Sequence, residues 1–208
     1  MKWCLVVIGL LMSTLNSANE IEKMIELLNN KQSTANSLKQ AITLGKERAI
    51  LCGYCHGKDG NSVKEYIPNL AGQHPEYLVT QFEAFSQGSR YNYVMAKLAK
   101  NLSIEERVNL ALYYASLQVK PSKVSTDNVQ KQAGKVLFSS RCVMCHGSEG
   151  LGKHSLPRLA GQPEQYIINT LNIFRQGHRK LPGSPMQGIA AGLTKPDIAA
   201  VAAYITSM

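Results

Sequence analysis

Two short stretches of this chain carry thiols and an imidazole at the same spacing, namely Cys52, Cys55 and His56, and then Cys142, Cys145 and His146. On a helical turn, cysteines three positions apart lie on one face, so both thiols can bond to one planar ring system. A Cys-x-x-Cys pair alone also occurs in thioredoxin-like redox sites and in zinc sites. Two copies, each followed directly by His, instead indicate covalent attachment of two c-type haems, with the histidine as an iron ligand.

The second axial ligand of each iron has few candidates in the sequence. Outside the attachment motifs, the available side chains are His74 and Met95 in the first half and His154, His178, Met186 and Met208 in the second. Met95 and Met186 are the pair in equivalent positions, 39 residues after His56 and 40 after His146. A buried methionine is ordinarily core filling, but the matched spacing favours ligation, and the three histidines are then expected on the surface.

Ligation by His and Met has a chemical consequence. Thioether sulfur raises the reduction potential relative to two imidazoles, and six-coordinate iron leaves no position for peroxide or nitrite. Pro68 and Pro157 follow the two histidines at similar distances. A proline carbonyl that accepts the Nδ1 hydrogen of the histidine would fix its tautomer and orientation, although each could equally be an ordinary loop proline.

These residues belong to an internal repeat. Pro68 to Gln73 matches Pro157 to Gln162, and further pairs are Tyr77 with Tyr166, Phe85 with Phe174, Arg90 with Arg179, and Tyr113 with Tyr204. The pattern within each repeat is helical, with no competing strand-like alternation. First helices are expected near Ser37 and Asp127, middle helices from Pro75 or Pro163 to Gly88 or Gly177, and last helices capped by Ser103 with Glu106 and Thr194 with Asp197. The sequence therefore predicts an all-α protein with two domains of one fold.

The repeat also suggests the boundaries of the segments. Residues 1–18 resemble a cleavable secretory signal, with Lys2 before a short apolar run and small residues at the end. Residues 19–36 have no equivalent in the second repeat and are expected to form an extra amphipathic helix, which either packs on the first domain or docks a partner. Domain 1 is expected at 37–117, a polar linker at 118–127 and domain 2 at 128–208.

Charge is distributed unevenly between the two halves. Residues 19–119 hold eleven Lys and Arg against ten Asp and Glu, whereas residues 120–208 hold eleven against four. The second half is thus strongly basic, which favours an acidic protein partner or an anionic membrane surface. No nucleic-acid motif accompanies this charge, and the 44% hydrophobic and 18% charged composition is that of a globular protein.

The paired motifs resemble those of the dihaem cytochrome c4 family. The shared features are two Cys-x-x-Cys-His motifs, two Pro-x-Leu-Ala-Gly-Gln segments with a downstream Tyr, two Phe-x-x-Gly-x-Arg segments, and two methionines ahead of a capped final helix. The resemblance implies two class I cytochrome c domains about a pseudo-twofold axis, with His56/Met95 and His146/Met186 as iron ligands and Pro68 and Pro157 supporting the histidines. It also implies electron transport in the periplasm, loosely at the membrane, from a quinol-oxidising complex to a haem-copper terminal oxidase.

Three functions remain after this reading. The first is a free electron carrier with no catalytic activity, whose basic half meets an acidic oxidase or reductase. The second is the cytochrome subunit of a flavoprotein dehydrogenase acting on a sulfur compound, with the extra helix as part of the interface. The third is a dihaem peroxidase-like enzyme, against which the paired methionines argue because they close the sixth position.

Overall fold

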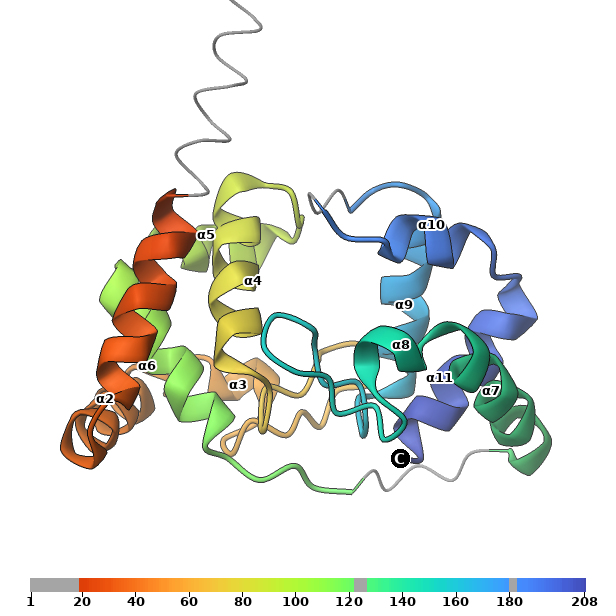
Figure 1. Cartoon of the computed structure of the whole chain (residues 1–208), viewed down its shortest axis with the longest axis horizontal. Helices are drawn as coiled ribbons and strands as arrows, with labels where there is room; N and C mark the ends of the chain where they lie inside the picture. Colours follow the sequence, from red (N-terminus) through yellow and green to blue (C-terminus); the bar gives the residue numbers. More distant parts are fainter. Residues whose placement is uncertain (1–18, 122–126, 180–182) are drawn as a thin grey trace, which may run out of the picture.

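A computed structural model describes residues 19–121, 127–179 and 183–208. Within these ranges the chain is helical, without strands, and forms two halves that lie side by side (Figure 1). The first half contains α2 (Ala35–Arg48), α3 (Gly53–His56), α4 (Pro75–Gln87), α5 (Tyr93–Lys100) and α6 (Ile104–Ala115). The second half repeats this order with α7 (Asn128–Arg141), α8 (Val143–His146), α9 (Glu164–Arg175), α10 (Met186–Ala191) and α11 (Lys195–Thr206). The all-α class and the repeat are therefore confirmed.

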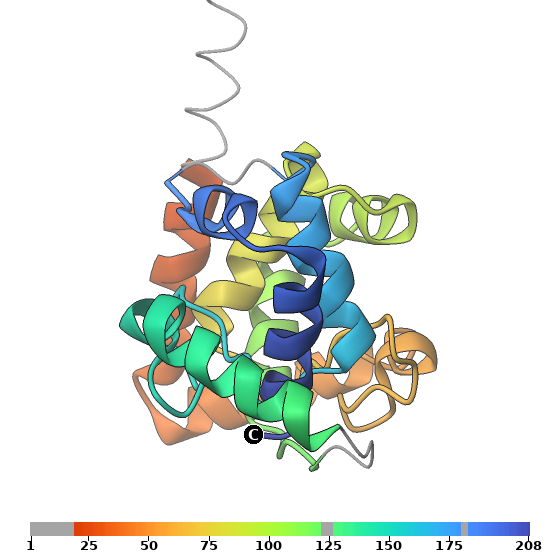
Figure 2. The ribbon, with the colours of Figure 1, turned by 90° about the vertical axis from the view of Figure 1, so that its right-hand side faces the viewer.

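Each half is built on a close crossing of its first and last helices. In the first half α2 packs on α6, and in the second α7 packs on α11. Figure 2 shows the second of these crossings. A Cβ atom on Gly45 would lie 2.1 Å from the carbonyl oxygen of Asn109, and one on Gly134 would lie 1.9 Å from that of Ala200. The two glycines therefore let the helix backbones meet at a distance that any side chain would prevent.

Helix starts follow local capping chemistry. The capping boxes predicted at Ser103 with Glu106 and at Thr194 with Asp197 are confirmed, and Asp127 caps α7 as expected. The predicted start of α2 near Ser37 is wrong. Thr34 is the N-cap instead. Its backbone is extended, with φ of −135°, and its hydroxyl accepts a hydrogen bond from the backbone N–H of Ser37.

Residues 19–32 form a further helix ahead of the repeat. Met24 and Leu28 have no exposed surface and belong to the core of the first half, and Lys31 pairs with Glu105 of α6 at 2.6 Å. The apolar face of this helix therefore packs on its own domain. The expected extent of 19–36 is too long, because α2 already begins at Ala35. The proposed signal at 1–18 lies outside the described residues, as do positions 122–126 of the expected linker.

A buried ion pair distinguishes the first half from the second. Glu83 on α4 accepts a 2.8 Å hydrogen bond from Arg107 on α6, and both side chains are more than nine-tenths buried. Arg107 also donates to the carbonyls of Ala99 and Leu102 at the end of α5. Ile198 follows the cap Thr194 by four residues, as Arg107 follows Ser103, so the second half holds an apolar side chain there, 1% exposed.

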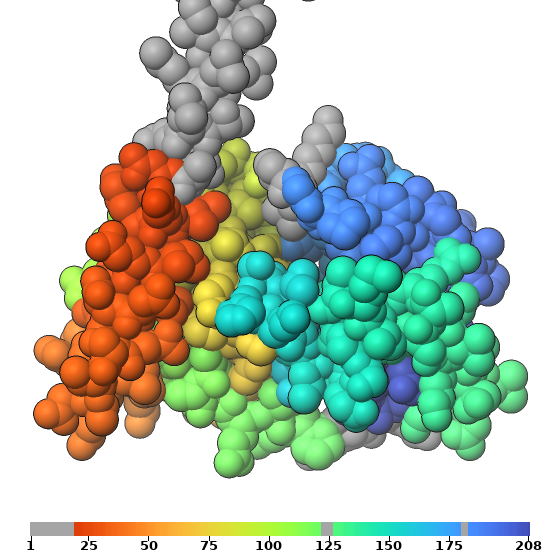
Figure 3. All heavy atoms as spheres, viewed as in Figure 1, coloured from red at the N-terminus to blue at the C-terminus, as the bar shows by residue number. Residues whose placement is uncertain are grey.

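The two halves meet through a reciprocal set of hydrogen bonds. The side-chain amide of Gln73 bonds both the N–H and the carbonyl of Arg158, at 2.8 and 2.9 Å. Gln162, the repeat equivalent of Gln73, bonds the N–H and the carbonyl of Asn69 at 3.0 and 2.9 Å. Residues 147–161 of the second half lie against the first half (Figure 3). Because each glutamine reaches the other half in the same way, a pseudo-twofold relation holds at the interface.

Candidate functional site

Both attachment histidines are held in the same way. His56 ends α3 and His146 ends α8. The Nδ1 atom of each lies 3.0 Å from a proline carbonyl oxygen, that of Pro68 for His56 and that of Pro157 for His146. Burial lowers the pKa of both imidazoles. A neutral ring that donates from Nδ1 keeps its lone pair at Nε2, which is the form that ligates a metal.

The four motif cysteines lie in or directly before the short helices, with Cys52 and Cys142 at the N-caps of α3 and α8 and Cys55 and Cys145 one turn further on. Cys52 and Cys142 are half-buried beside the two cores, and Cys55 is exposed. Burial raises the pKa of Cys52 and raises that of Cys142 to about 11. A thioredoxin-type redox site depends on a lowered thiol pKa, and neither Cys52 nor Cys142 has one. Together with a neutral imidazole, the donor set therefore fits a covalently attached haem in each half.

Met95 and Met186 occupy corresponding places in the two halves. Met95 lies in the first turn of α5, where its N–H is bonded to the side chain of the N-cap Asn92 at 3.0 Å. Met186 opens α10 and packs against the second core. Helix α5 packs on α4 and α10 packs on α9, so each methionine is half-buried next to the middle helix of its half.

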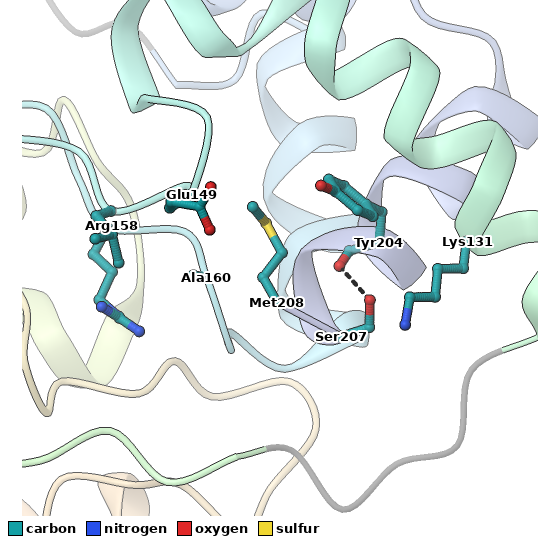
Figure 4. A pocket seen from close by; sticks show the side chains of 8 residues that line it. Lys131, Glu149, Arg158, Ala160, Tyr204, Ser207 and Met208 are labelled. Atoms are coloured by element: carbon teal, nitrogen blue, oxygen red, sulfur yellow. Dashed lines mark hydrogen bonds between the residues drawn. The ribbon is translucent and has the colours of Figure 1, made fainter.

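The C-terminal Met208, which the sequence also offered as a ligand, lies elsewhere. Its sulfur would be 3.1 Å from a Cβ on Gly150, and it helps to line a cavity of about 390 Å³ with Glu149, Arg158 and Tyr204 (Figure 4). The Met208 side chain packs against α11 and against the loop that follows His146. Met208 is therefore a half-buried residue that packs against the core of the second half.

The remaining histidines only partly match the expectation of solvated surface residues. His178 is exposed, as expected. His74 is half-buried and its Nε2 lies 2.8 Å from the carbonyl oxygen of Leu151 in the other half, so the expectation is wrong for this residue. The side chain of His154 is 80% exposed, and its Nδ1 lies 3.3 Å from a carboxylate oxygen of Glu76. Both residues bridge the two halves because the loop of residues 147–161 lies there.

Two repeat-related arginines also meet at the interface between the halves. Arg90 donates to the side-chain oxygen of Gln81 at 2.9 Å and to the hydroxyl of Tyr166 at 3.1 Å. Arg179 donates to the same oxygen of Gln81 at 2.5 Å and is 4% exposed. Each guanidinium also stacks over a phenylalanine of its own half, Phe85 or Phe174. The arginines were found by sequence as repeat pairs, but no role was assigned to them.

Gln81 escaped the sequence comparison because its partner in the repeat is different. Position 170, eight residues after Gln162 as Gln81 is eight after Gln73, is Thr. The buried pair of Glu83 and Arg107 escaped for the same reason, since Asn172 and Ile198 stand at the corresponding positions. A repeat search finds what the halves share, whereas these side chains break the symmetry.

Comparison with known proteins agrees with the assignment of one haem to each half. The family model Cytochrome c matches residues 131–208. Cytochrome c4 of Pseudomonas aeruginosa is 36% identical over 174 residues, covering 79% of this chain and 87% of the relative. The thiosulfate dehydrogenase electron acceptor of Stutzerimonas stutzeri strain A1501 is 32% identical over 199 residues, 88% of this chain and 91% of the relative.

A solved structure shows the same architecture. Reduced recombinant cytochrome c4 from Pseudomonas stutzeri superposes with a TM-score of 0.72 at 32% identity, over 79% of this chain and 96% of that chain. The match spans both halves, so the two haem motifs lie in two cytochrome c domains. The chain therefore belongs to the cytochrome c4 family and is an electron-transfer protein, without enzymatic activity of its own, that carries two covalently bound haem c groups.

Proposed function

We propose that this chain is a periplasmic carrier that takes one electron per haem from a quinol-oxidising complex and delivers it to a haem-copper terminal oxidase. The observation that carries the proposal is the matched set in each half: a neutral histidine bonded to a proline carbonyl, and a methionine in the first turn of a helix packed on the middle helix. Export would require that residues 1–18 act as a cleavable signal.

In this proposal the protein's residues hold the iron in one geometry through the redox cycle. His56 and His146 donate Nε2, and the carbonyls of Pro68 and Pro157 prevent rotation of the imidazoles. The thioether sulfurs of Met95 and Met186 would supply the second ligand of each iron. The haem supplies a reversible one-electron change between ferric and ferrous iron. With both ligands supplied by the protein, the site would rearrange little on electron transfer and would leave no position for oxygen or peroxide.

The basic second half is the proposed contact with the electron acceptor. None of the described helices is long and apolar enough to cross a membrane. Opposite charges on the two partners raise the association rate, and dissolved salt screens them with a Debye length of about 10 Å at 0.1 M. The rate of electron transfer to an isolated oxidase should therefore fall as ionic strength rises, and a rate independent of salt would contradict this contact.

Substitution of two matched lysines tests whether the contact lies on the second half. Lys46 and Lys135 each follow the crossing glycine of their helix, and both are exposed. Lys135→Glu should slow electron transfer to the oxidase more than Lys46→Glu, because only Lys135 lies in the basic half. An equal effect of both changes would show that net charge, and not a surface on the second half, governs the association.

A second function is favoured by the wide match to a thiosulfate dehydrogenase electron acceptor. In that case the donor would be a dehydrogenase acting on a sulfur compound. The extra helix is a poor candidate for the interface, since its apolar face is covered by its own domain. Size-exclusion chromatography of a native extract separates the alternatives: a stoichiometric complex with a dehydrogenase would overturn the free carrier, and elution of the cytochrome alone would support it.

A further inference from the structure

Helix α5, which carries Met95, ends against a buried guanidinium. The last carbonyls of a helix have no partner within the helix, and in α5 the carbonyl of Ala99 accepts a 2.8 Å hydrogen bond from Arg107 of α6. Arg107 also donates to the carbonyl of Leu102, just beyond the helix, at 3.2 Å. A positive charge at this end of a helix interacts favourably with the helix dipole. Arg107 therefore joins the end of α5 to α6.

Glu83 of the middle helix α4 holds this guanidinium in place. One carboxylate oxygen of Glu83 accepts from Arg107 at 2.8 Å, and the other accepts from the side-chain amide of Gln87 at 2.9 Å. The Glu83 and Arg107 side chains are 2% and 9% exposed, so little water competes for these hydrogen bonds. All three nitrogens of the guanidinium are engaged. The pair is thus a fixed link between α4, α6 and the end of α5.

The start of α5 is held as well. The side-chain oxygen of Asn92 accepts the backbone N–H of Met95 at 3.0 Å. Met95 is the third residue of α5, and Ala99 follows it by about one turn. Because the helix has only eight residues, hydrogen bonds at both ends leave little freedom for the turn that carries Met95.

Helix α10, which carries Met186, begins with weaker support. Its N-cap, Pro185, makes no side-chain capping hydrogen bond, and the N–H of Met186 lies 3.4 Å from the hydroxyl oxygen of Ser184. The apolar Ile198 stands where the first half has Arg107. The second half therefore lacks the buried guanidinium at this position.

The end of α10 is held by arginines from other positions of the repeat. Arg141 of α7 donates to the carbonyl of Gly192 at 2.8 Å, but its side chain is exposed. Arg175 of α9 donates to the carbonyl of Leu193 at 3.4 Å, near the limit for a hydrogen bond. Water competes for the first contact, and the second is long. The two methionines thus lie in equivalent places but on helices that are held with different firmness.

We propose that Arg107, held by Glu83, is a positioning residue that keeps Met95 on the iron of the first haem. An added ligand reaches a six-coordinate iron only after a protein ligand has left it. Met95 leaves by rotation of its side chain or by movement of α5, and the buried link prevents the second route. Met186 lacks this protection, so small ligands bind the second haem first. The inference rests on the axial ligands of the proposed function and on no electron-transfer partner.

The test is a titration of the ferric holo protein with imidazole, followed by proton NMR. The paramagnetic iron of each haem shifts the signals of its methionine ligand out of the main spectrum, so the two sites are followed separately. Met95→His and Met186→His assign these signals, since each variant removes one set. In the unmodified protein, imidazole should displace Met186 at a concentration about tenfold lower than Met95, which corresponds to one or two hydrogen bonds.

Arg107→Lys removes the link but keeps a cation beside Glu83. Lysine lacks the planar fork that reaches Ala99 and Leu102 together, so imidazole binding at the first haem should tighten about tenfold while the second haem is unaffected. Arg175→Lys is the matched control, because the same substitution at the end of α10 loses only one bond of 3.4 Å. It should change imidazole binding at either haem by less than about twofold.

A double variant separates positioning from stability. Glu83→Asn combined with Arg107→Ile introduces the side chains that the second half has at these places, Asn172 and Ile198. It leaves no buried charge unpaired, so the first domain should resist urea better than with Glu83→Gln alone. Its first haem should nevertheless bind imidazole as readily as in Arg107→Lys, because α5 has lost its link. Imidazole binding that followed stability instead would mean that the pair has a structural role only.

Two further results would overturn the inference. Equal imidazole affinity of the two haems in the unmodified protein would show that the link protects nothing. Unchanged affinity of the first haem in Arg107→Lys, or in the double variant should Arg107→Lys not accumulate, would show that Met95 is positioned without it. Failure of the proposed function looks different: shifted methionine signals would then be missing from the unmodified protein, and the inference would fall together with the assigned ligands.

Discussion

At the scale of single residues, the proline carbonyls explain why the histidines suit iron. A buried imidazole loses stability in its charged form, and a carbonyl at Nδ1 orients the neutral ring. The sequence predicted these contacts because His and Pro recur at similar spacing in both halves. It could not predict Gln81, because a residue present in one half only leaves no repeat signal, and because its role depends on an arginine 98 positions away.

The methionine ligands yield the first prediction. Met95→His or Met186→His should each lower the potential of one haem by more than about 59 mV, a tenfold change for one electron, because imidazole favours ferrous iron less than thioether sulfur does. Redox titration of each variant measures the change. Met208→Leu is the control, since Met208 packs beside Gly150 and should leave both potentials in place. Unchanged potentials in both histidine variants would disprove the assigned ligands.

At the scale of helices, capping residues and prolines predicted where most helices begin. The sequence did not show how closely two helices approach each other. Ser103, Thr194 and Asp127 cap through bonds to residues two or three positions away, so the pattern is local. Gly45 and Gly134 look like helix-weakening residues when only propensity is considered. Their value comes from a helix more than sixty positions away, against which no side chain would fit.

The helix crossing yields the second prediction. Gly134→Ala should lower the free energy of unfolding by about 1–3 kcal/mol, because overpacking at Ala200 exceeds the gain in helix propensity. Gly188→Ala in α10 is the control, since a Cβ there meets nothing within 4 Å, and should be neutral or stabilising. Urea unfolding of the holo proteins compares them. Equal stability of the two variants would mean that the crossing can relax.

The buried ion pair yields the third prediction. Glu83→Gln leaves Arg107 buried without its counter-ion and should cost about 3–5 kcal/mol in unfolding free energy. Glu105→Gln breaks the exposed pair with Lys31 and should cost less than about 1 kcal/mol. Thermal unfolding monitored for each domain should place the larger loss in the first. A loss of similar size in both variants would argue that the buried charge is reached by water.

At the scale of the whole molecule, the duplication is readable from sequence, but the docking of the halves is not. In the sequence, Gln73 and Gln162 are equivalent residues of the repeat. Only the structure shows that each forms hydrogen bonds to the backbone of the opposite half. Backbone partners leave no side-chain signature to search for. The same applies to His74, which was expected in solvent and instead contacts Leu151.

The amide pair yields the fourth prediction. Gln162→Leu should leave the N–H and carbonyl of Asn69 without partners, at about 1–3 kcal/mol per buried group, and so loosen the interface. Hydrogen exchange of the Asn69 amide in the holo protein should accelerate, while Gln165→Leu, on the exposed side of α9, should not change it. Undiminished protection in Gln162→Leu would show that the remaining contacts suffice.

The reciprocal glutamines bear on how such a molecule arises. An interface in which each half offers the same groups to the other is the isologous contact of a symmetric homodimer, so a single-domain ancestor with Gln at this position could have paired with itself. In such a dimer one sequence must serve in both halves. After fusion of two copies, the residues of each half could change independently. Gln81 opposite Thr170, and Glu83 opposite Asn172, are what that release permits: two halves that keep the same histidine supports and the same docking glutamines, but differ at single buried positions nearby.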